Sequence, residues 1–168
     1  GLEANLILRP DGSKQWQQVY GYPEIGLSLA VWDLGNKNQL GTGVALIPYI
    51  DFPISKGKKT AFDLKFGWGI GYVDKIFDAD DNYKNVAIGS HLNCALILQP
   101  RFKADITQHL SLNGGLSITH FSNGSITMPN LGLNLMSVTG GISYKFGSQN
   151  IINRTALPPF TKSSRTTF

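Results

Sequence analysis

A histidine and a serine stand two residues apart in the stretch 119-THFSNGSITMPNLGLN-134, at the end of a run of alternating apolar residues. Nucleophilic catalysis combines these residue types, because a serine hydroxyl attacks poorly until a nearby base takes its proton. In a β-strand, residues two apart point to the same face, so His120 and Ser122 can share one face. Their meaning therefore depends on the elements that position them.

The composition indicates a β-structure. The 168 residues suffice for one domain. Charged residues make up 15% of the chain, aromatic residues 11%, and glycine occurs 19 times, a profile of strands and tight turns. The net charge of +4 comes from scattered lysines and arginines, so nucleic acid is not an expected partner. A single cysteine excludes an intrachain disulfide.

The pattern of apolar residues indicates membrane strands. No apolar run approaches the ~20 residues of a membrane helix, and the start of the sequence has no signal-peptide pattern. A barrel strand needs only ~10 residues, apolar at every second position. Residues 61–73 show this period: Phe62, Leu64, Phe66, Trp68, Ile70 and Tyr72 alternate with charged residues and glycines. Residues 92–106 repeat it.

Eight segments carry strand signals of differing clarity. They are residues 2–9, 14–20, 24–34, 39–52, 61–73, 92–106, 109–121 and 132–146. An even number lets an antiparallel up-and-down barrel close without exposed edges. Because segment 14–20 is short and polar, the eighth strand could instead lie upstream of Gly1. The prediction is an all-β, eight-stranded transmembrane β-barrel over residues 1–147, followed by a polar, disordered tail over 148–168.

A soluble barrel with an apolar interior would show the same alternation. The polar face argues against it, since Asp63, Lys65, Arg101 and Lys103 would be costly in a dry core but can pair in a polar lumen. The connections at 53–60 and 107–108 are short, whereas those at 74–91 and 122–132 are long and fall at the opposite end. Short turns at one end and long loops at the other are typical of outer-membrane barrels.

Strand parity places three polar residues on the lipid-facing wall. Continuing by twos from Leu116 and Ile118 leads to His120 and Ser122, and stepping back by two from Met136 leads to Asn134. An unpaired polar group facing hydrocarbon is costly, so a hydrogen-bonded cluster with a function is expected. The simpler alternative is that His120 and Ser122 only end the strand at headgroup level, where polar groups are ordinary.

The run His120-Phe121-Ser122-Asn123, followed by Pro129-Asn130 and Gly132, resembles the signature of the lipid A 3-O-deacylase (PagL) family. An HxSN motif followed at fixed spacing by PNxG is far more specific than a serine and a histidine alone. The resemblance implies a barrel in the outer membrane of a Gram-negative bacterium that hydrolyses the 3-position ester of lipid A. Its partners would be lipopolysaccharide and the membrane, and no metal or organic cofactor is expected. The sequence does not decide between a monomer and a homodimer.

The resemblance also implies roles for individual residues. Ser122 would be the nucleophile, His120 its general base, and position 134 the residue that orients the imidazole. Asn130 matches an oxyanion-stabilising position, with Asn123 and the amide of Gly124 as weaker candidates.

The sequence departs from the family at position 134, where the best-known members carry an acid and this chain carries asparagine. No Asp or Glu follows Asp105, so the sequence offers no carboxylate nearby. Asn134 can accept the imidazole N–H but cannot stabilise an imidazolium by charge, so a slow enzyme is expected. The competing hypothesis is a non-catalytic barrel that binds lipopolysaccharide or serves as structural wall.

Three further features lie in or beside segment 74–91. Lys75 and Lys84 are expected to attract the lipid A phosphates. The acidic group Asp78, Asp80 and Asp81 lacks the spacing of a calcium-binding loop, so no metal site is expected. Ser90 and His91 are adjacent and so point to opposite faces of a strand, which favours a strand-start feature over a catalytic pair.

Overall fold

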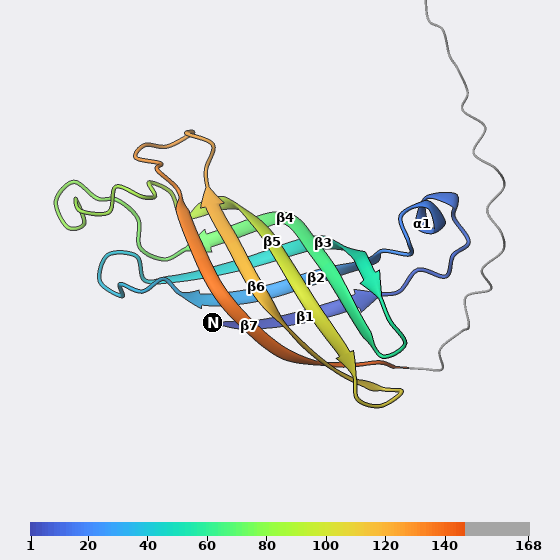
Figure 1. Ribbon diagram of the computed structural model, residues 1–168. Coiled ribbons are helices and arrows are strands. Elements are labelled where there is room, and N and C mark those ends of the chain that lie inside the picture. Colours follow the sequence, from blue (N-terminus) through green and yellow to red (C-terminus); the bar gives the residue numbers. More distant parts are fainter. Residues whose placement is uncertain (147–168) are drawn as a thin grey trace, which may run out of the picture.

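The computed structural model describes residues 1–146 as one antiparallel β-sheet that curls into a half-barrel (Figure 1). Each strand pairs with the next in the chain, which confirms the predicted all-β, up-and-down arrangement. The strands are β1 (Leu2–Leu8), β2 (Glu24–Asp33), β3 (Thr42–Lys56), β4 (Thr60–Val73), β5 (Leu92–Asp105), β6 (Leu110–Ser122) and β7 (Leu133–Tyr144). Within the described residues, β1 and β7 are the edges of the sheet, so a closed eight-stranded barrel stays a prediction. The predicted tail, residues 148–168, lies outside the described residues.

The strand predicted over 14–20 is wrong, because this segment contains the short helix α1 (Gln15–Val19). The backbone N–H of Lys14 donates to Gln17 Oε1 (3.2 Å), and Gln18 Nε2 donates to the carbonyl of Gly12 (2.8 Å). Since β1 and β2 pair directly with each other, the ladder has no place for a strand between them. The polar side chains of this segment therefore bond locally and form the connection.

The two faces of the sheet differ in the predicted sense. On β4, Phe66 and Trp68 point outward and are exposed, whereas Asp63 and Lys65 point to the concave face and are buried. β5 repeats the arrangement, with Phe102 exposed and Arg101 buried. In this part of β4 and β5, the orientation matches a barrel with an apolar outer wall and a polar interior.

The concave face carries an ion-pair network toward the end with the short turns. Arg101 contacts Asp51, and both side chains are almost fully buried. Lys103 Nζ bridges three carboxylates, lying 2.8 Å from Glu24, 3.0 Å from Asp51 and 2.8 Å from Asp63. Lys65 reaches across to Glu3 on β1. These pairs satisfy charges that would be costly if buried alone.

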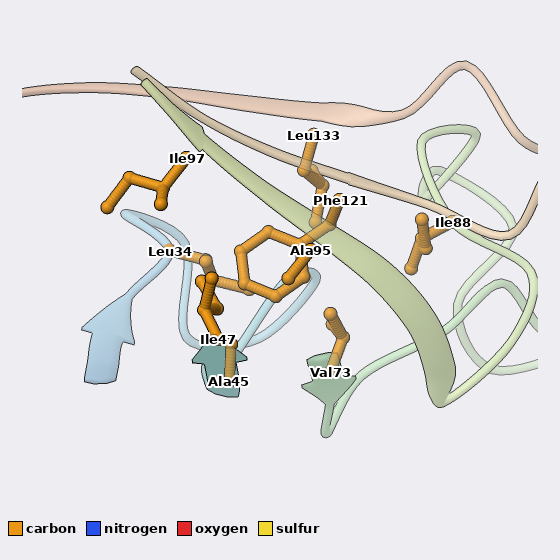
Figure 2. Close-up of a cluster of buried hydrophobic side chains, with 9 residues drawn as sticks. All are labelled: Leu34, Ala45, Ile47, Val73, Ile88, Ala95, Ile97, Phe121 and Leu133. Atoms are coloured by element: carbon orange, nitrogen blue, oxygen red, sulfur yellow. The ribbon is translucent and has the colours of Figure 1, made fainter. Parts of the chain in front are cut away.

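An apolar cluster that the strand pattern does not predict fills the concave face toward the end with connections 34–41, 74–91 and 123–132. It gathers side chains from β3 to β7 and from two connections around the ring of Phe121 (Figure 2). Its members are Leu34, Ala45, Ile47, Val73, Ile88, Ala95, Ile97, Phe121 and Leu133. The predicted polar lumen is therefore confirmed for only part of the concave face.

The expected difference in connection length between the two ends of the sheet is present only in part, because residues 9–23, which join β1 to β2 through α1, lie at the same end as the short turns (Figure 1). β3 continues through a register shift at Pro53/Ser55 to Lys56, so the predicted turn at 53–60 shrinks to residues 57–59. The longer connections 34–41, 74–91 and 123–132 gather at the opposite end (Figure 1). The described part of the chain contains no helix with the length and apolar character needed to cross a membrane.

Candidate active site

The pairing of β6 with β7 brings His120 directly opposite Asn134. His120 Nδ1 lies 2.8 Å from Asn134 Oδ1. Because this oxygen can only accept, Nδ1 carries a proton; in the neutral ring this is the tautomer that leaves the lone pair on Nε2, as a general base requires. The partner expected at position 134 is therefore in contact with the ring.

Gly132 supports the same imidazole from the end of the β6–β7 connection. Its φ of +79° lies in the left-handed region that favours glycine. A Cβ at this position would lie 2.7 Å from His120 Cε1, too close for any other residue without displacing the ring. Glycine therefore suits position 132 for two reasons: it adopts the positive φ, and it leaves room for the imidazole of His120.

Two donors converge on the hydroxyl of Ser122. Asn130 Nδ2 donates to Ser122 Oγ at 3.0 Å, and the backbone N–H of Gly124 donates at 3.2 Å. Within residues 1–146, no hydrogen bond joins Ser122 to His120, although both lie on the outward face of β6. Catalytic hydrogen bonds often tighten only in the complex with substrate, so the separation does not exclude a nucleophile and base.

Asn123 holds the loop rather than facing the wall. Its side chain is buried, and Nδ2 donates to Ser90 Oγ (2.8 Å) and to the carbonyl of Thr127 (2.9 Å). Its backbone N–H donates to Asn130 Oδ1 (3.2 Å). Because its donors are engaged in these bonds, Asn123 is less suited to an oxyanion than Asn130 and Gly124 are.

The outward surface beside the pair is apolar. Ser122 lies opposite Cys94 of β5, and His120 lies opposite Leu96. One strand farther, Cys94 pairs with Ile70 and Leu96 pairs with Trp68, whose side chains are 63% and 65% exposed. The site is thus a small polar cluster at the margin of a broad apolar wall.

The predicted phosphate-binding lysines lie in the connection 74–91. Lys75 and Lys84 are both exposed, and Lys84 Nζ lies 5.8 Å from the centre of the Tyr83 ring. Among the described residues, neither ammonium group has a hydrogen bond to Ser122 or His120. Their role toward a phosphate stays a prediction.

The acidic group in the same connection has a local role. Asp78 Oδ1 accepts the backbone N–H groups of Asp80 and Asp81, each at 2.9 Å, and these bonds lower the pKa of Asp78. In the part of the chain that the structure describes, no group of three or more metal-ligating side chains occurs.

Ser90 and His91 have separate partners, and no hydrogen bond joins their side chains among the described residues. His91 Nδ1 lies 2.7 Å from the carbonyl of Val73, and its ring stacks on Tyr72. Ser90 Oγ donates to the carbonyl of Leu92 (3.0 Å) and accepts from Asn123, so it connects two loops. The sequence carries no signal for this last contact, because the two residues lie 33 positions apart.

A protein-family model described as lipid A 3-O-deacylase (PagL) matches residues 1–145. The matched range includes all seven strands and the outward cluster, which consists of His120, Ser122, Gly124, Asn130 and Asn134. Comparisons with curated proteins and with solved structures gave no significant match.

Proposed function

The chain belongs to the lipid A 3-O-deacylase family, and we propose that it is an outer-membrane ester hydrolase that uses Ser122 as nucleophile and His120 as general base. The family accounts for the reaction, the release of the acyl chain at the 3-position of lipid A. The observation that carries the assignment of residues is the convergence of two N–H donors on Ser122 Oγ, beside a histidine whose free nitrogen is Nε2.

In the proposed acylation step, Ser122 Oγ attacks the ester carbonyl carbon while its proton passes to His120 Nε2. The carbonyl oxygen becomes an oxyanion. Asn130 Nδ2 and the N–H of Gly124, which donate to Ser122 Oγ in the free protein, would turn to this neighbouring oxygen and donate to it. The bond from the carbonyl carbon to the sugar oxygen then breaks, and His120 returns the proton to that oxygen. This leaves an acyl-enzyme and a free 3-hydroxyl on the sugar.

In the proposed deacylation step, water replaces the sugar oxygen. His120 takes a proton from the water, whose oxygen attacks the acyl carbon, and the same two donors stabilise the second oxyanion. The bond to Ser122 Oγ breaks, and His120 gives the proton to Oγ, which restores the hydroxyl and the neutral imidazole. A free fatty acid leaves, so all atoms are accounted for without a cofactor.

Asn134 would hold His120 in the productive tautomer through the 2.8 Å bond to Nδ1. An amide cannot offset the positive charge of the imidazolium formed during attack, so we expect slower turnover than with a carboxylate. A neutral amide is, however, less costly than a carboxylate on a surface that faces lipid.

The apolar wall suggests how the substrate lies. Exposed Trp68 and Ile70 on β4, together with half-buried Leu96 on β5, extend from the site across these two strands. An acyl chain could lie along this surface while its ester reaches Ser122. The lipid would then not need to leave the membrane plane.

Mass spectrometry of purified lipid A, incubated with the detergent-solubilised protein, tests this function. The expected result is loss of one hydroxyacyl chain with wild type and none with Ser122→Ala. Equal loss with the variant would exclude Ser122 as nucleophile. An unchanged spectrum after long incubation with wild type would favour the alternative, a barrel that binds lipopolysaccharide or serves as structural wall without hydrolysing it.

A further inference from the structure

The end of the β4–β5 connection clamps the β6–β7 connection, which carries Asn130. The two segments come from different hairpins and meet at three points. The N–H of Gly132 donates to the carbonyl of Ala87 (2.9 Å), Ser90 Oγ accepts from Asn123 Nδ2 (2.8 Å), and a Cβ at Gly89 would lie 2.8 Å from the carbonyl carbon and oxygen of Met128. The backbone of the second connection is thus in direct contact with the first.

The clamping segment is itself firmly held. Ile88 is fully buried in the apolar cluster. Asn93, at the start of β5, donates through Nδ2 to the carbonyls of Ser90 (2.8 Å) and His91 (3.1 Å). The backbone of Ser90 is therefore held by the buried Ile88 before it and by the hydrogen bonds from Asn93 after it.

Three hydrogen bonds connect this hydroxyl to the nucleophile by way of two residues, Asn123 and Asn130. Ser90 Oγ holds the buried side chain of Asn123, and the backbone N–H of Asn123 donates to Asn130 Oδ1. The other end of the same amide, Nδ2, donates to Ser122 Oγ. The orientation of the Asn130 amide is therefore set from its oxygen side.

We propose that Ser90 is a positioning residue that aligns the Asn130 amide with the oxyanion through Asn123, an inference that rests on the proposed function. Ser90 does not touch the reacting atoms. It lies outside the HxSN and PNxG motifs, in the connection between β4 and β5. The alignment of Asn130 would therefore depend on a second hairpin as well as on its own.

Ser90 can affect the rate because an oxyanion hole tolerates only small displacements of its donors. Removing one donor outright costs ~10²–10³-fold in kcat, because donors act only within a narrow range around the developing charge. Removing the Ser90 hydroxyl leaves one N–H of the buried Asn123 amide without its acceptor, and an unsatisfied buried donor favours rearrangement. A shift of Asn123 moves Asn130 by way of their shared bond. The donor is then misplaced rather than lost, so the expected loss is smaller.

Kinetics of Ser90→Ala with lipid A in mixed micelles test the inference. We expect kcat to fall about tenfold with KM unchanged, because the misplaced donor acts mainly in the transition state. Ser90→Thr, which keeps the hydroxyl, should recover most of the rate. The matched control is Ser28→Ala, which removes a buried hydroxyl bonded to Glu3 on the concave face and should leave kcat unchanged.

A double-mutant cycle separates positioning from a general structural role. If Ser90 acts through Asn130, Ser90→Ala should change kcat by less than about twofold in an Asn130→Ala background, because coupled residues are not additive. A full tenfold loss in that background would overturn the proposal, as would an unchanged kcat in the single variant.

A substrate-free measurement decides the inference even if the protein proves inactive. In ¹⁵N-asparagine-labelled protein in micelles, the side-chain amide signal of Asn130 can be identified by its loss in Asn130→Ala. It should shift or broaden in Ser90→Ala, return in Ser90→Thr and stay in place in Ser28→Ala. An unmoved signal in Ser90→Ala would show that Ser90 does not orient Asn130, whatever the protein hydrolyses.

Discussion

The sheet carries two polar clusters on opposite faces, and they satisfy their polar groups in different ways. The concave cluster is dense in charge: Arg101 and Lys103 share the carboxylate of Asp51 away from lipid. The outward cluster around Ser122 contains no acidic side chain, and His120 is held by an amide.

The difference follows from what surrounds each cluster. On the concave face each buried ion contacts an ion of opposite charge, which offsets part of the cost of burial. On the outward face one side of every group meets the apolar wall, where neutral hydrogen bonds cost less than charges. We therefore expect changes in the outward cluster to alter catalysis, and changes in the concave cluster to alter stability.

The largest expected effect is on the outward face. His120→Ala removes the proposed base and should lower kcat on lipid A by about 10⁴-fold or more. Side chains on the wall contribute little to the backbone ladder, so resistance to heat unfolding in sodium dodecyl sulfate should be unchanged. A variant that loses its heat resistance together with its activity would contradict the separation of the two clusters.

A change in the concave cluster should have the opposite result. Asp51→Ala leaves Arg101 without its buried partner and should lower the free energy of unfolding by ~3–5 kcal/mol, while activity per folded molecule is retained. Urea unfolding in lipid vesicles measures the loss. Asp80→Ala, in an exposed connection, is the control and should change stability by less than ~0.5 kcal/mol. Equal unfolding midpoints for the two variants would disprove the prediction.

Exchanging the amide on the wall for a carboxylate tests the distinction directly. If Asn134 acts only as a hydrogen-bond acceptor, Asn134→Glu should raise the deacylation rate about tenfold, equivalent to ~1.4 kcal/mol in the transition state. Asn134→Ala should lower the rate, since the ring N–H loses its partner. Initial rates at several pH values compare the variants. A rate indifferent to both changes would remove position 134 from the mechanism.

The smallest expected effect concerns exposed charges beyond both clusters. Replacing Lys75 and Lys84 together by alanine should reduce the preference for phosphorylated over dephosphorylated lipid A only a few-fold, because exposed charges contribute ~0.2–1 kcal/mol each. The ratio of apparent KM values for the two substrates is the measurement. Lys56→Ala together with Lys58→Ala, at the opposite end of the sheet, is the control. An equal change in that control would indicate a general effect of net charge.

Much of the fold was predictable, because strand parity is a local property. Six predicted strands have nearly the bounds of observed ones, namely β1, β2, β4, β5, β6 and β7. The predicted strand 39–52 corresponds to β3, which extends farther, to Lys56. The error at residues 14–20 has a clear cause. A short polar segment has no periodicity, and the direct pairing of β1 with β2 decides its conformation.

The placement of the candidate site residues was predictable to a similar extent. Parity placed His120, Ser122 and Asn134 on one face, and the cross-strand pairing of His120 with Asn134 agrees with it. Parity could not show that the side chain of Asn123 turns inward to Ser90. That contact depends on how two loops pack, not on either loop alone.

The sequence by itself determined the strand periodicity, the apolar wall and the motif, because each depends on residues close together in the chain. The tertiary structure alone decided the partners of the buried charges, the apolar cluster around Phe121 and the clamp that holds Asn130. The physical reason is distance along the chain. A period of two is imposed by each strand's own backbone, whereas Ser90 and Asn123, or Asp51 and Arg101, meet only after the strands have paired in register.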